Sequence, residues 1–235
     1  QIFGTDGFAE SAARLLTLHA ELLKGGPVPE LNLGGGFGIA YTPADHPTPI
    51  EEIAREIASV VSAECARLGI KVPVICVEPG RAVIGTSTFT LYEVGTTKNV
   101  TVDVVDEHGF STGESAVRKY VSVDGGMSDN ARPALYGADY SVRIASRVSE
   151  AEPALVRIAG KHCESGDILV YADYLPGDVH PGDLLAIPAT GAYCWSLSSN
   201  YNYLTRPPVV AVKDGVARVI VRGETEEDLL ARDMG

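Results

Sequence analysis

The sequence predicts two kinds of fold in succession: alternating helices and strands over residues 1–84, and an all-β domain over residues 85–235. The first prediction rests on helix-length apolar periodicities that alternate with short apolar strands, and on the glycine loops that end both strands. This alternation indicates a parallel sheet, which collects its functional groups at the carboxyl ends of its strands. The second prediction rests on the short β-rich segments that succeed one another, with turns between them, after about Gly85.

The first helix is predicted over residues 6–23, where apolar side chains recur on one face until Gly25-Gly26 ends the pattern. A short apolar strand over residues 31–33 follows it. This strand stops at the loop Gly34-Gly35-Gly36-Phe37-Gly38.

The second helix has a complete start pattern. Thr48 can cap the helix, Pro49 suits its first position, and Glu51 completes a capping box. A continuous apolar strand over residues 72–77 then runs into Glu78-Pro79-Gly80-Arg81. Two such units cannot close a barrel, which needs eight. We therefore expect an open edge with exposed apolar surface on the second strand, and a chain that is the C-terminal part of a longer protein.

The predicted strands of the second domain share β-branched and aromatic composition and are separated by turns. They cover residues 89–105, 116–123, 140–148, 155–159, 168–171, 184–188, 209–212 and 216–221. Asp214-Gly215 is a two-residue hairpin pattern between the last two strands. The expected architecture is a sandwich or open barrel, followed by an acidic tail from Glu224 with a surface helix.

Composition excludes several classes of partner. The net charge of −12 and the pI near 4.8 argue against nucleic acid and against an anionic membrane surface, both of which need a basic face. No apolar run approaches the roughly 20 residues of a membrane span. Four cysteines without a CxxC pair indicate reduced thiols in a cytoplasmic protein. No metal site is predicted.

The stretch Val121–Tyr136 is the centre of the predicted site. An alternating strand runs into a double glycine, and Asp129, Arg132 and Tyr136 follow in a segment that Pro133 is expected to keep out of regular structure. Loops on a rigid scaffold are where ligands bind. The Arg132 fork suits a carboxylate, although a surface ion pair is an equally good interpretation.

The two glycine loops of the first part form a candidate anion site. The loop around Gly36 is a possible backbone nest for a phosphate, although tight turns also use glycine. The loop from Glu78 to Arg81 ends the neighbouring strand, so the two loops should lie side by side. This pairing favours a phosphate or carboxylate site over the alternative that Arg81 is only a surface cation.

The segment Gly160–Asp167 packs a thiol, an imidazole, a lysine and two carboxylates between two strands. Polar, turn-forming neighbours favour a reactive Cys163 over a buried one. His162 is its sequence neighbour and would point to the opposite face, so a proton-donating thiol fits better than a Cys–His nucleophile pair. A strand-end surface lysine is the preferred interpretation of Lys161.

The stretch from Gly191 to Asn202 is rich in aromatic and amide side chains. We expect Trp195 to pack into the core from a helix. Tyr193 follows a glycine and could reach a ligand.

Together, the motifs GGGFG, EPGR, VDGGMSDNARPALYG, CESGD and GAY…SSNYN resemble the diaminopimelate decarboxylase family. These are fold-type III pyridoxal-phosphate enzymes related to ornithine and arginine decarboxylases. The resemblance covers nearly the whole chain, and CESGD with SDNARPALYG is its most specific part. The ornithine branch typically carries aspartate where this chain has Glu164.

The resemblance implies roles for individual residues. Cys163 would supply a proton. The cofactor would be held by Gly36, Glu78, Pro79, Gly80, Arg81 and Tyr193, and the substrate by Arg81, Arg132, Tyr136, Glu164 and Tyr193. In the family, the loop with Cys163 and Glu164 enters the partner's site, which implies a homodimer with shared active sites.

The resemblance also implies a fold and a reaction. Residues 1–84 would be the last βα units of a pyridoxal-phosphate-binding (β/α)8 barrel, and residues 85–235 the C-terminal β domain. The expected reaction is decarboxylation of the amino acid meso-2,6-diaminopimelate to L-lysine. The family's Schiff-base lysine lies in the missing barrel half, so we expect the fragment alone to be inactive. The alternatives are an ornithine, arginine or carboxypolyamine decarboxylase, and a non-catalytic β fragment.

Overall fold

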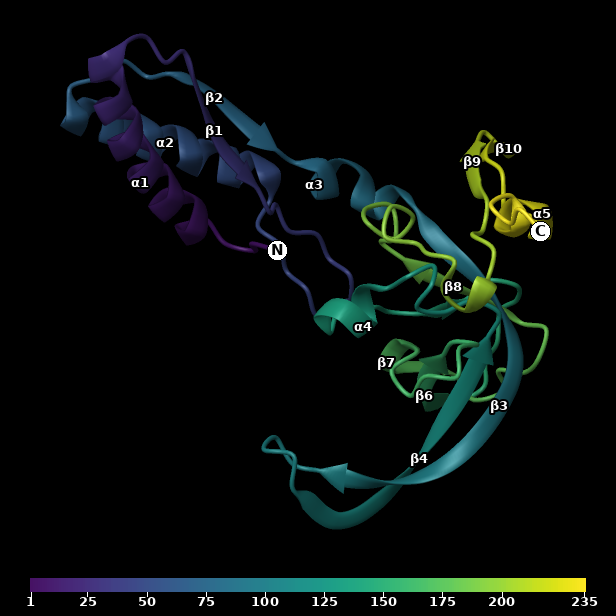
Figure 1. Cartoon of the computed structure of the whole chain (residues 1–235). Coiled ribbons are helices and arrows are strands. Elements are labelled where there is room, and N and C mark those ends of the chain that lie inside the picture. Colours follow the sequence, from purple (N-terminus) through teal and green to yellow (C-terminus); the bar gives the residue numbers. More distant parts are fainter. The chain divides into compact units, whose positions relative to one another are not determined.

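The computed structural model describes all 235 residues and divides into two compact units, Gln1–Ser87 and Thr88–Gly235. Neither unit contains a helix that is both long and apolar enough to cross a membrane. The first unit is built from α1 (Asp6–Leu22), η1 (Leu23–Gly25), β1 (Glu30–Gly35), α2 (Ile50–Leu68), β2 (Val74–Glu78), α3 (Gly80–Ile84) and η2 (Gly85–Ser87), as Figure 1 shows.

The core of the first unit lies between its two long helices and its parallel strands. β1 and β2 pair in parallel, with Glu30 opposite Val74 and Gly35 opposite Glu78, so both strands end at the same edge. The predicted helices and strands are confirmed. The buried side chains come from every layer: Phe8, Ala12, Leu16, Leu33, Phe37, Ile53, Ile57, Val61 and Cys65.

The start of α2 differs from the prediction. The helix begins at Ile50, Pro49 occupies the N-cap position, and no side chain caps it. The Thr48 N–H donates to the Phe3 carbonyl oxygen at 3.0 Å, which holds Thr48 in the preceding loop. The capping box predicted at Thr48 and Glu51 is therefore wrong. The end of α2 is a left-handed Gly69, with φ 66°, a conformation that glycine adopts without strain.

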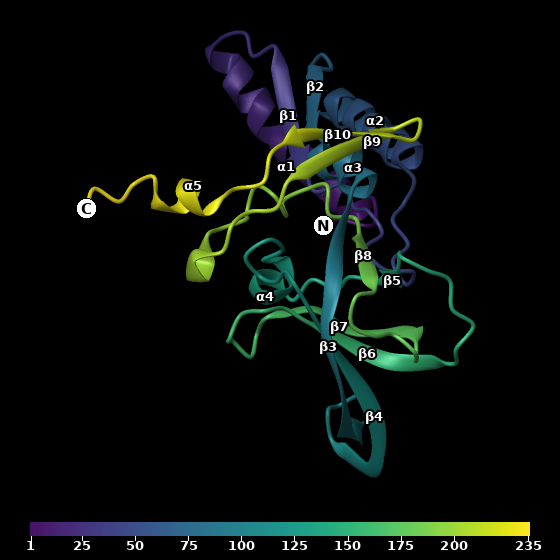
Figure 2. The same ribbon diagram turned by 90° about the vertical axis from the view of Figure 1, so that its right-hand side faces the viewer.

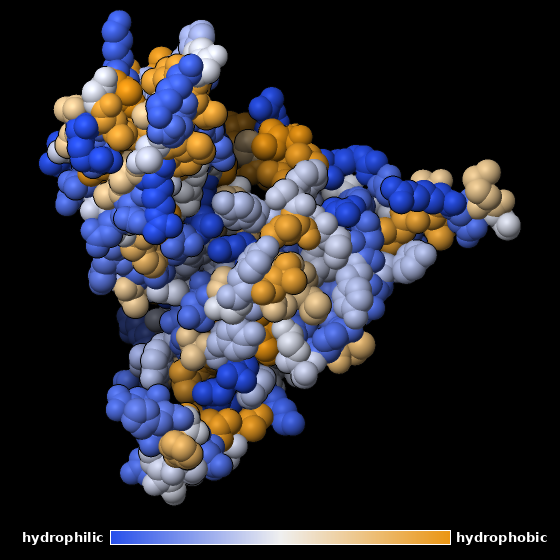
Figure 3. Space-filling view, turned by 60° about the vertical axis from the view of Figure 1, so that its left-hand side comes forward, coloured by the Kyte–Doolittle hydropathy of each residue, from blue (hydrophilic) through white to orange (hydrophobic).

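Apolar side chains of β2 are exposed, as expected for a two-stranded parallel sheet. Val74 and Val77, on opposite faces of the strand, are 61 and 41 % exposed, Val72 just before the strand is 56 % exposed, and β1 is the only strand that pairs with β2. Parallel sheets are normally covered on both faces. On the face shown in Figure 3, apolar patches interrupt a mostly hydrophilic surface.

The second unit is a six-stranded sheet with a separate C-terminal hairpin. Its elements are β3 (Phe89–Val105), β4 (Ser111–Val123), α4 (Arg132–Tyr136), β5 (Arg143–Ile144), β6 (Pro153–Ala159), β7 (Ile168–Pro176), β8 (Leu184–Pro188), η3 (Tyr201–Tyr203), β9 (Val209–Lys213), β10 (Val216–Val221) and α5 (Glu226–Leu230). The order in the large sheet is β5-β8-β3-β4-β6-β7, and only the β4–β6 pair is parallel. β3 and β4 form a long curved hairpin, which Figure 2 shows from the side.

The core of this unit is formed by the inward residues of the large sheet, including Tyr92, Val121, Val156, Ile158, Leu169 and Leu185. The Asp214-Gly215 turn is confirmed: both residues have positive φ, at 52° and 75°, and join the antiparallel strands β9 and β10. The predicted surface helix in the acidic tail is also confirmed: it is α5, and none of its residues is buried.

Three local predictions are wrong. Only Arg143–Ile144 of the segment 140–148 is a strand, because the Val142 N–H donates to the Asp173 carboxylate at 2.8 Å instead of to a neighbouring strand. Trp195 is 49 % exposed and lies in a run of turns, not in a core helix. Pro133 lies in the first turn of α4, where its missing N–H costs no helical hydrogen bond.

Candidate functional site

The two strand-end loops of the first unit are tied together by Asn32. Its side-chain N–H donates to the Glu78 carboxylate at 2.8 Å, and its side-chain oxygen accepts from the Gly34 N–H at 2.7 Å. Gly35 lies opposite Glu78, where a Cβ would be 2.4 Å from the Glu78 carbonyl oxygen. Only glycine permits this close approach. Glu78 therefore links the strands, and its negative carboxylate is no ligand for a phosphate.

The loop around Gly36 has the backbone of an anion cradle. Gly34 and Gly36 have φ values of 77° and 99°, and these turns direct successive N–H groups to one side. The Gly36 carbonyl accepts from the Ile2 N–H at 2.7 Å, and the Gly38 N–H donates back to the Ile2 carbonyl at 3.0 Å. The Gly36 N–H belongs to the β1–β2 ladder: Gly35 pairs in parallel with Glu78, and because Pro79 has no N–H, the ladder bond to the Glu78 carbonyl comes from Gly36. The Phe37 N–H is the backbone donor that remains at the end of β1.

Arg81 stands at the end of the neighbouring strand. It lies in the short helix α3, which begins at Gly80 directly after Pro79, and its guanidinium donates to the Gln1 side-chain oxygen at 3.0 Å. The structure thus brings the predicted residues Glu78–Arg81 to the same sheet edge as Gly36. The arrangement offers the Phe37 backbone N–H and one cation, which suits a phosphate.

In the second unit, Asp167 joins the two loops that carry most predicted site residues. Its carboxylate accepts from the Met127 N–H at 2.6 Å and from the His162 N–H at 2.8 Å. Asp167 is 2 % exposed. A Cβ on Gly126 or Gly160 would lie within 2.7 Å of this carboxylate, which explains the glycines at these positions. Asp167 thereby fixes the positions of both loops.

Asp129 is the second buried acid of this region. Its Oδ1 accepts from the Tyr92 hydroxyl at 3.0 Å and from the Gly126 N–H at 3.2 Å. Burial raises the pKa of Asp129 from 3.8 to about 6, because these hydrogen bonds only partly compensate for the lost hydration.

Arg132 belongs to a buried chain of polar contacts. Its guanidinium donates to the Tyr140 hydroxyl at 2.6 Å, Tyr140 lies 3.6 Å from the Cys194 sulfur, and Cys194 donates to the Asn130 side-chain oxygen at 3.5 Å. Burial raises the pKa of both Tyr140 and Cys194, so both remain protonated. The guanidinium also lies 5.7 Å from the Tyr193 ring centre.

The predicted substrate residues are therefore only partly together. The structure brings Arg132 against Tyr193, which is 43 % exposed and has a left-handed φ of 71°. Arg132 itself is only 7 % exposed, so one face of its guanidinium is packed rather than free. Tyr136, one turn along α4, is 68 % exposed instead.

The loop between β6 and β7 presents Cys163 to solvent and buries His162, as their opposite orientations predicted. The Cys163 sulfur lies 3.6 Å from the Glu164 carboxylate, which also accepts from the Tyr201 hydroxyl at 2.5 Å. The hydrogen bond from Tyr201 lowers the pKa of Glu164 below its ordinary value. Glu164 Oε2 is shielded from solvent and has no hydrogen-bond partner. The thiol therefore lies beside an ionised carboxylate that can accept one more donor.

Sequence reasoning assigned no function to Tyr140, Asp167 and Tyr201, and it named Asp129 without its partners. The sequence did mark the stretches that contain Asp129, Asp167 and Tyr201, but it gave no indication of their partners. Tyr140 was assigned only to a strand. Each acts through a partner that only the fold brings near, up to 40 residues away in sequence.

Two models of known protein families match this chain. They are "Pyridoxal-dependent decarboxylase, pyridoxal binding domain" over residues 1–85, and "Pyridoxal-dependent decarboxylase, C-terminal sheet domain" over residues 83–191. The chain is 50 % identical over 240 residues to diaminopimelate decarboxylase of Mycobacterium tuberculosis, and 48 % identical over 236 residues to that of Corynebacterium efficiens. All of this chain is aligned in both cases, but only 52 % and 49 % of those relatives. The chain thus spans about half the length of the curated relatives it matches.

A solved structure also resembles this chain along its whole length. The crystal structure of diaminopimelate decarboxylase from M. jannaschii in complex with L-lysine superposes with a TM-score of 0.85 at 30 % identity. The superposition covers 100 % of this chain and 50 % of that one.

Proposed function

Because this chain belongs to the pyridoxal-dependent decarboxylases, we propose that it works as the C-terminal part of a diaminopimelate decarboxylase. The complete enzyme would convert meso-2,6-diaminopimelate to L-lysine and CO2, the final step of lysine biosynthesis. One observation carries this proposal: the chain matches diaminopimelate decarboxylases along its whole length at up to 50 % identity. An ornithine, arginine or carboxypolyamine decarboxylase is the alternative.

The first unit fits the phosphate of the cofactor. The loop at Gly36, with the Phe37 N–H, and the loop Pro79-Gly80-Arg81 would hold it at the common end of β1 and β2. Tyr193 would also bind the cofactor, through its ring and hydroxyl. Glu78 supports this site indirectly, by joining the two strands through Asn32. Pyridoxal phosphate, when bound, supplies the electron sink that makes loss of CO2 from an amino acid possible.

The second unit offers groups that match the distal end of the substrate, which carries one carboxylate and one ammonium. Arg132 would bind the carboxylate, with its guanidinium oriented by the Tyr140 hydroxyl, and the exposed Tyr136 would close over it. Glu164, on the loop that would enter the partner's active site, would bind the ammonium there through Oε2, which makes no hydrogen bond in this chain. Arg81 would bind the substrate from the first unit.

The proton would come from Cys163. After CO2 leaves, the Cys163 Sγ–H donates its proton to the carbon that carried the carboxylate, and solvent restores the thiol. Its exposed position on the β6–β7 loop supports this role. The same exposure supports a homodimer in which this loop enters the partner's active site.

We propose that residues 1–84 are the last βα units of the barrel and residues 85–235 the C-terminal β domain. The exposed apolar face of β2 supports completion of the sheet by further strands. This stretch of chain alone would then neither close a barrel nor decarboxylate. The four free cysteines support a cytoplasmic location.

The experiment is a comparison of kcat/KM for meso-2,6-diaminopimelate, ornithine, arginine and a carboxylated polyamine precursor, with the complete enzyme and pyridoxal phosphate. We expect diaminopimelate to be the preferred substrate. Turnover of ornithine alone would replace the proposal with its alternative. Absence of CO2 from all four would favour the remaining possibility, a β domain that only binds or dimerises.

A further inference from the structure

We propose that a clamp of three side chains positions the Glu164 carboxylate for the distal ammonium of the substrate. The clamp consists of Asn200, Arg206 and Glu224. These are positioning residues that act through the turn Tyr201–Tyr203. The inference rests on the proposed function, because it assigns a task to Glu164 only as a substrate-binding residue.

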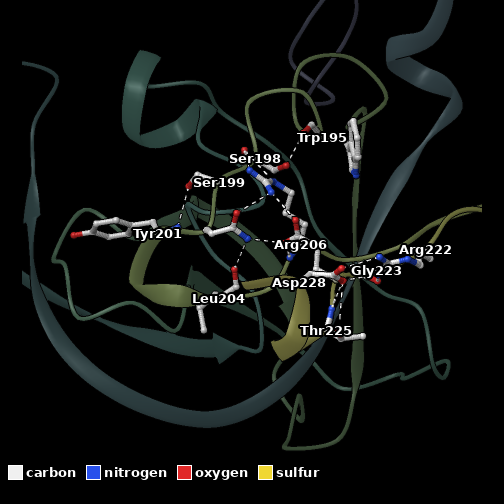
Figure 4. A network of polar contacts seen from close by, with 12 residues as sticks. Trp195, Ser198, Ser199, Tyr201, Leu204, Arg206, Arg222, Gly223, Thr225 and Asp228 are labelled. Atoms are coloured by element: carbon white, nitrogen blue, oxygen red, sulfur yellow. Dashed lines mark hydrogen bonds and ion pairs between the residues drawn. The ribbon is translucent and has the colours of Figure 1, made fainter. Parts of the chain in front are cut away.

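The clamp is a closed network of charged and amide groups, and Figure 4 shows the polar contacts around Arg206. Arg206 Nη1 donates to Glu224 Oε1 at 2.6 Å and to Asn200 Oδ1 at 2.8 Å. Glu224 Oε2 accepts from Asn200 Nδ2 at 2.5 Å and from the Arg206 backbone N–H at 2.8 Å. Both carboxylate oxygens of Glu224 are thus required as acceptors. Arg206 and Glu224 together hold the Asn200 side chain in one place.

The turn that follows Asn200 needs such support. Asn202 and Tyr203 are consecutive non-glycine residues with left-handed φ values of 53° and 56°. Residues other than glycine rarely adopt this backbone conformation, and it persists only where surrounding contacts enforce it. Tyr203 is 74 % exposed, so packing does not hold that side of the turn. The clamp supplies contacts at its start, where the Asn200 side-chain amide also donates to the Leu204 carbonyl at 3.0 Å and so spans the turn.

The turn reaches the predicted substrate loop through two side chains. The Tyr201 hydroxyl donates to Glu164 at 2.5 Å, and the Asn202 amide lies 3.3 Å from His162 Nδ1. The Tyr201 and His162 rings lie 5.4 Å apart. The Tyr201 hydroxyl binds Oε1 of Glu164, and Asn202 of the same turn also stabilises the ionised carboxylate. Oε2 makes no hydrogen bond and is left to the ligand.

The loop that carries Glu164 and Cys163 has its own anchor. Asp167 holds it through the His162 and Met127 N–H groups, and neither contact involves the clamp. Loss of the clamp should therefore disorient the Glu164 carboxylate while the loop backbone and Cys163 stay in place. This predicts a loss of distal-ammonium binding with little change in the chemical step.

The test uses two variants of the complete enzyme. In Glu224→Gln the side chain has one acceptor oxygen and one NH2 group, whereas the clamp needs two acceptor oxygens. At least one N–H group of Asn200 or Arg206 would then face the NH2 group of the glutamine. Tyr201→Phe removes only the hydroxyl that contacts Glu164. The control is Arg222→Gln, because Arg222 pairs with Asp228 in the same region, is 68 % exposed and makes no hydrogen bond to Asn200, Arg206 or Glu224.

The readout compares two competitive inhibitors that differ in one group. L-Lysine carries an α-ammonium beside its carboxylate, whereas 6-aminohexanoate lacks that ammonium. In both variants we expect the inhibition constant of L-lysine to rise about tenfold, as for loss of a hydrogen bond to a charged group. The inhibition constant of 6-aminohexanoate and kcat for diaminopimelate should change less than threefold.

Three outcomes would overturn the inference: an unchanged constant for L-lysine, an equal rise for both inhibitors, or the same rise in Arg222→Gln. An equal rise would mean that the clamp only supports folding. Failure of the wild-type enzyme to decarboxylate diaminopimelate would instead reject the proposed function, and that measurement is made first.

Discussion

Replacing Asp129 with asparagine is expected to stabilise the second unit at high pH and to leave it unchanged at low pH. Folding raises the pKa of Asp129 from 3.8 to about 6 because the carboxyl is buried. The folded state therefore binds the proton more tightly than the unfolded state. The free energy of unfolding must then fall as pH rises from about 4 to about 6.

The magnitude follows from the size of this change. Each pKa unit is worth about 1.4 kcal/mol, so the rise from 3.8 to about 6 makes ionised Asp129 cost about 3 kcal/mol. Asparagine keeps an oxygen for the Tyr92 hydroxyl and the Gly126 N–H, because both of these bonds are made to Oδ1. It loses only the longer 3.3 Å bond to Oδ2. The expected net gain at pH 8 is about 2 kcal/mol.

Scanning calorimetry at pH 4 and pH 8 measures this effect. At pH 8 the melting temperature of the second unit should rise by about 5 °C in Asp129→Asn, and at pH 4 it should match the wild type. Asp124→Asn is the matched control, since Asp124 is an exposed neighbour whose carboxylate accepts from the Glu93 N–H at 2.9 Å. An equal difference between variant and wild type at both pH values would refute the reasoning.

Three further substitutions test other residues. Cys163→Ala should lower turnover about 10²–10⁴-fold with cofactor still bound, as for a lost general acid, and an unchanged rate in single-turnover kinetics would remove its catalytic role. Arg132→Ala should raise KM for diaminopimelate at least about tenfold with cofactor retained; loss of cofactor absorbance would mean that its partner was misassigned. Asp183→Asn should destabilise the protein by about 2 kcal/mol at pH 7, because Arg147 lowers the pKa of the buried Asp183 from 3.8 to about 2. This difference should disappear as pH falls from about 4 to about 2, and a difference that persists in urea unfolding at pH 2 would contradict it.

Local pattern was sufficient for most elements. The apolar faces of α1 and α2 and the hairpin at Asp214-Gly215 follow from residues within one or two turns of each other, and the structure confirms them. The capping of α2 was mispredicted because a distant backbone contact, from Thr48 to Phe3, competes with the local pattern. The burial of Trp195 was mispredicted because positive φ at Tyr193 accompanies a run of turns instead of a helix.

The candidate site also combines features that local sequence predicts with contacts that it does not. Residue types singled out Cys163 and Arg132 as candidates, and the family resemblance added Glu164. The contacts that orient them were not predictable: the Tyr140 hydroxyl on Arg132 and the Tyr201 hydroxyl on Glu164 depend on how distant loops meet. Residues that bind through their own chemistry can be found in a sequence, whereas residues that position others need the fold.

The central claim is tested most directly by the products formed from meso-2,6-diaminopimelate by the complete enzyme with pyridoxal phosphate. The account predicts one CO2 and one L-lysine for each diaminopimelate consumed, with no release of CO2 when the cofactor is omitted. CO2 released from ornithine but not from diaminopimelate would contradict it.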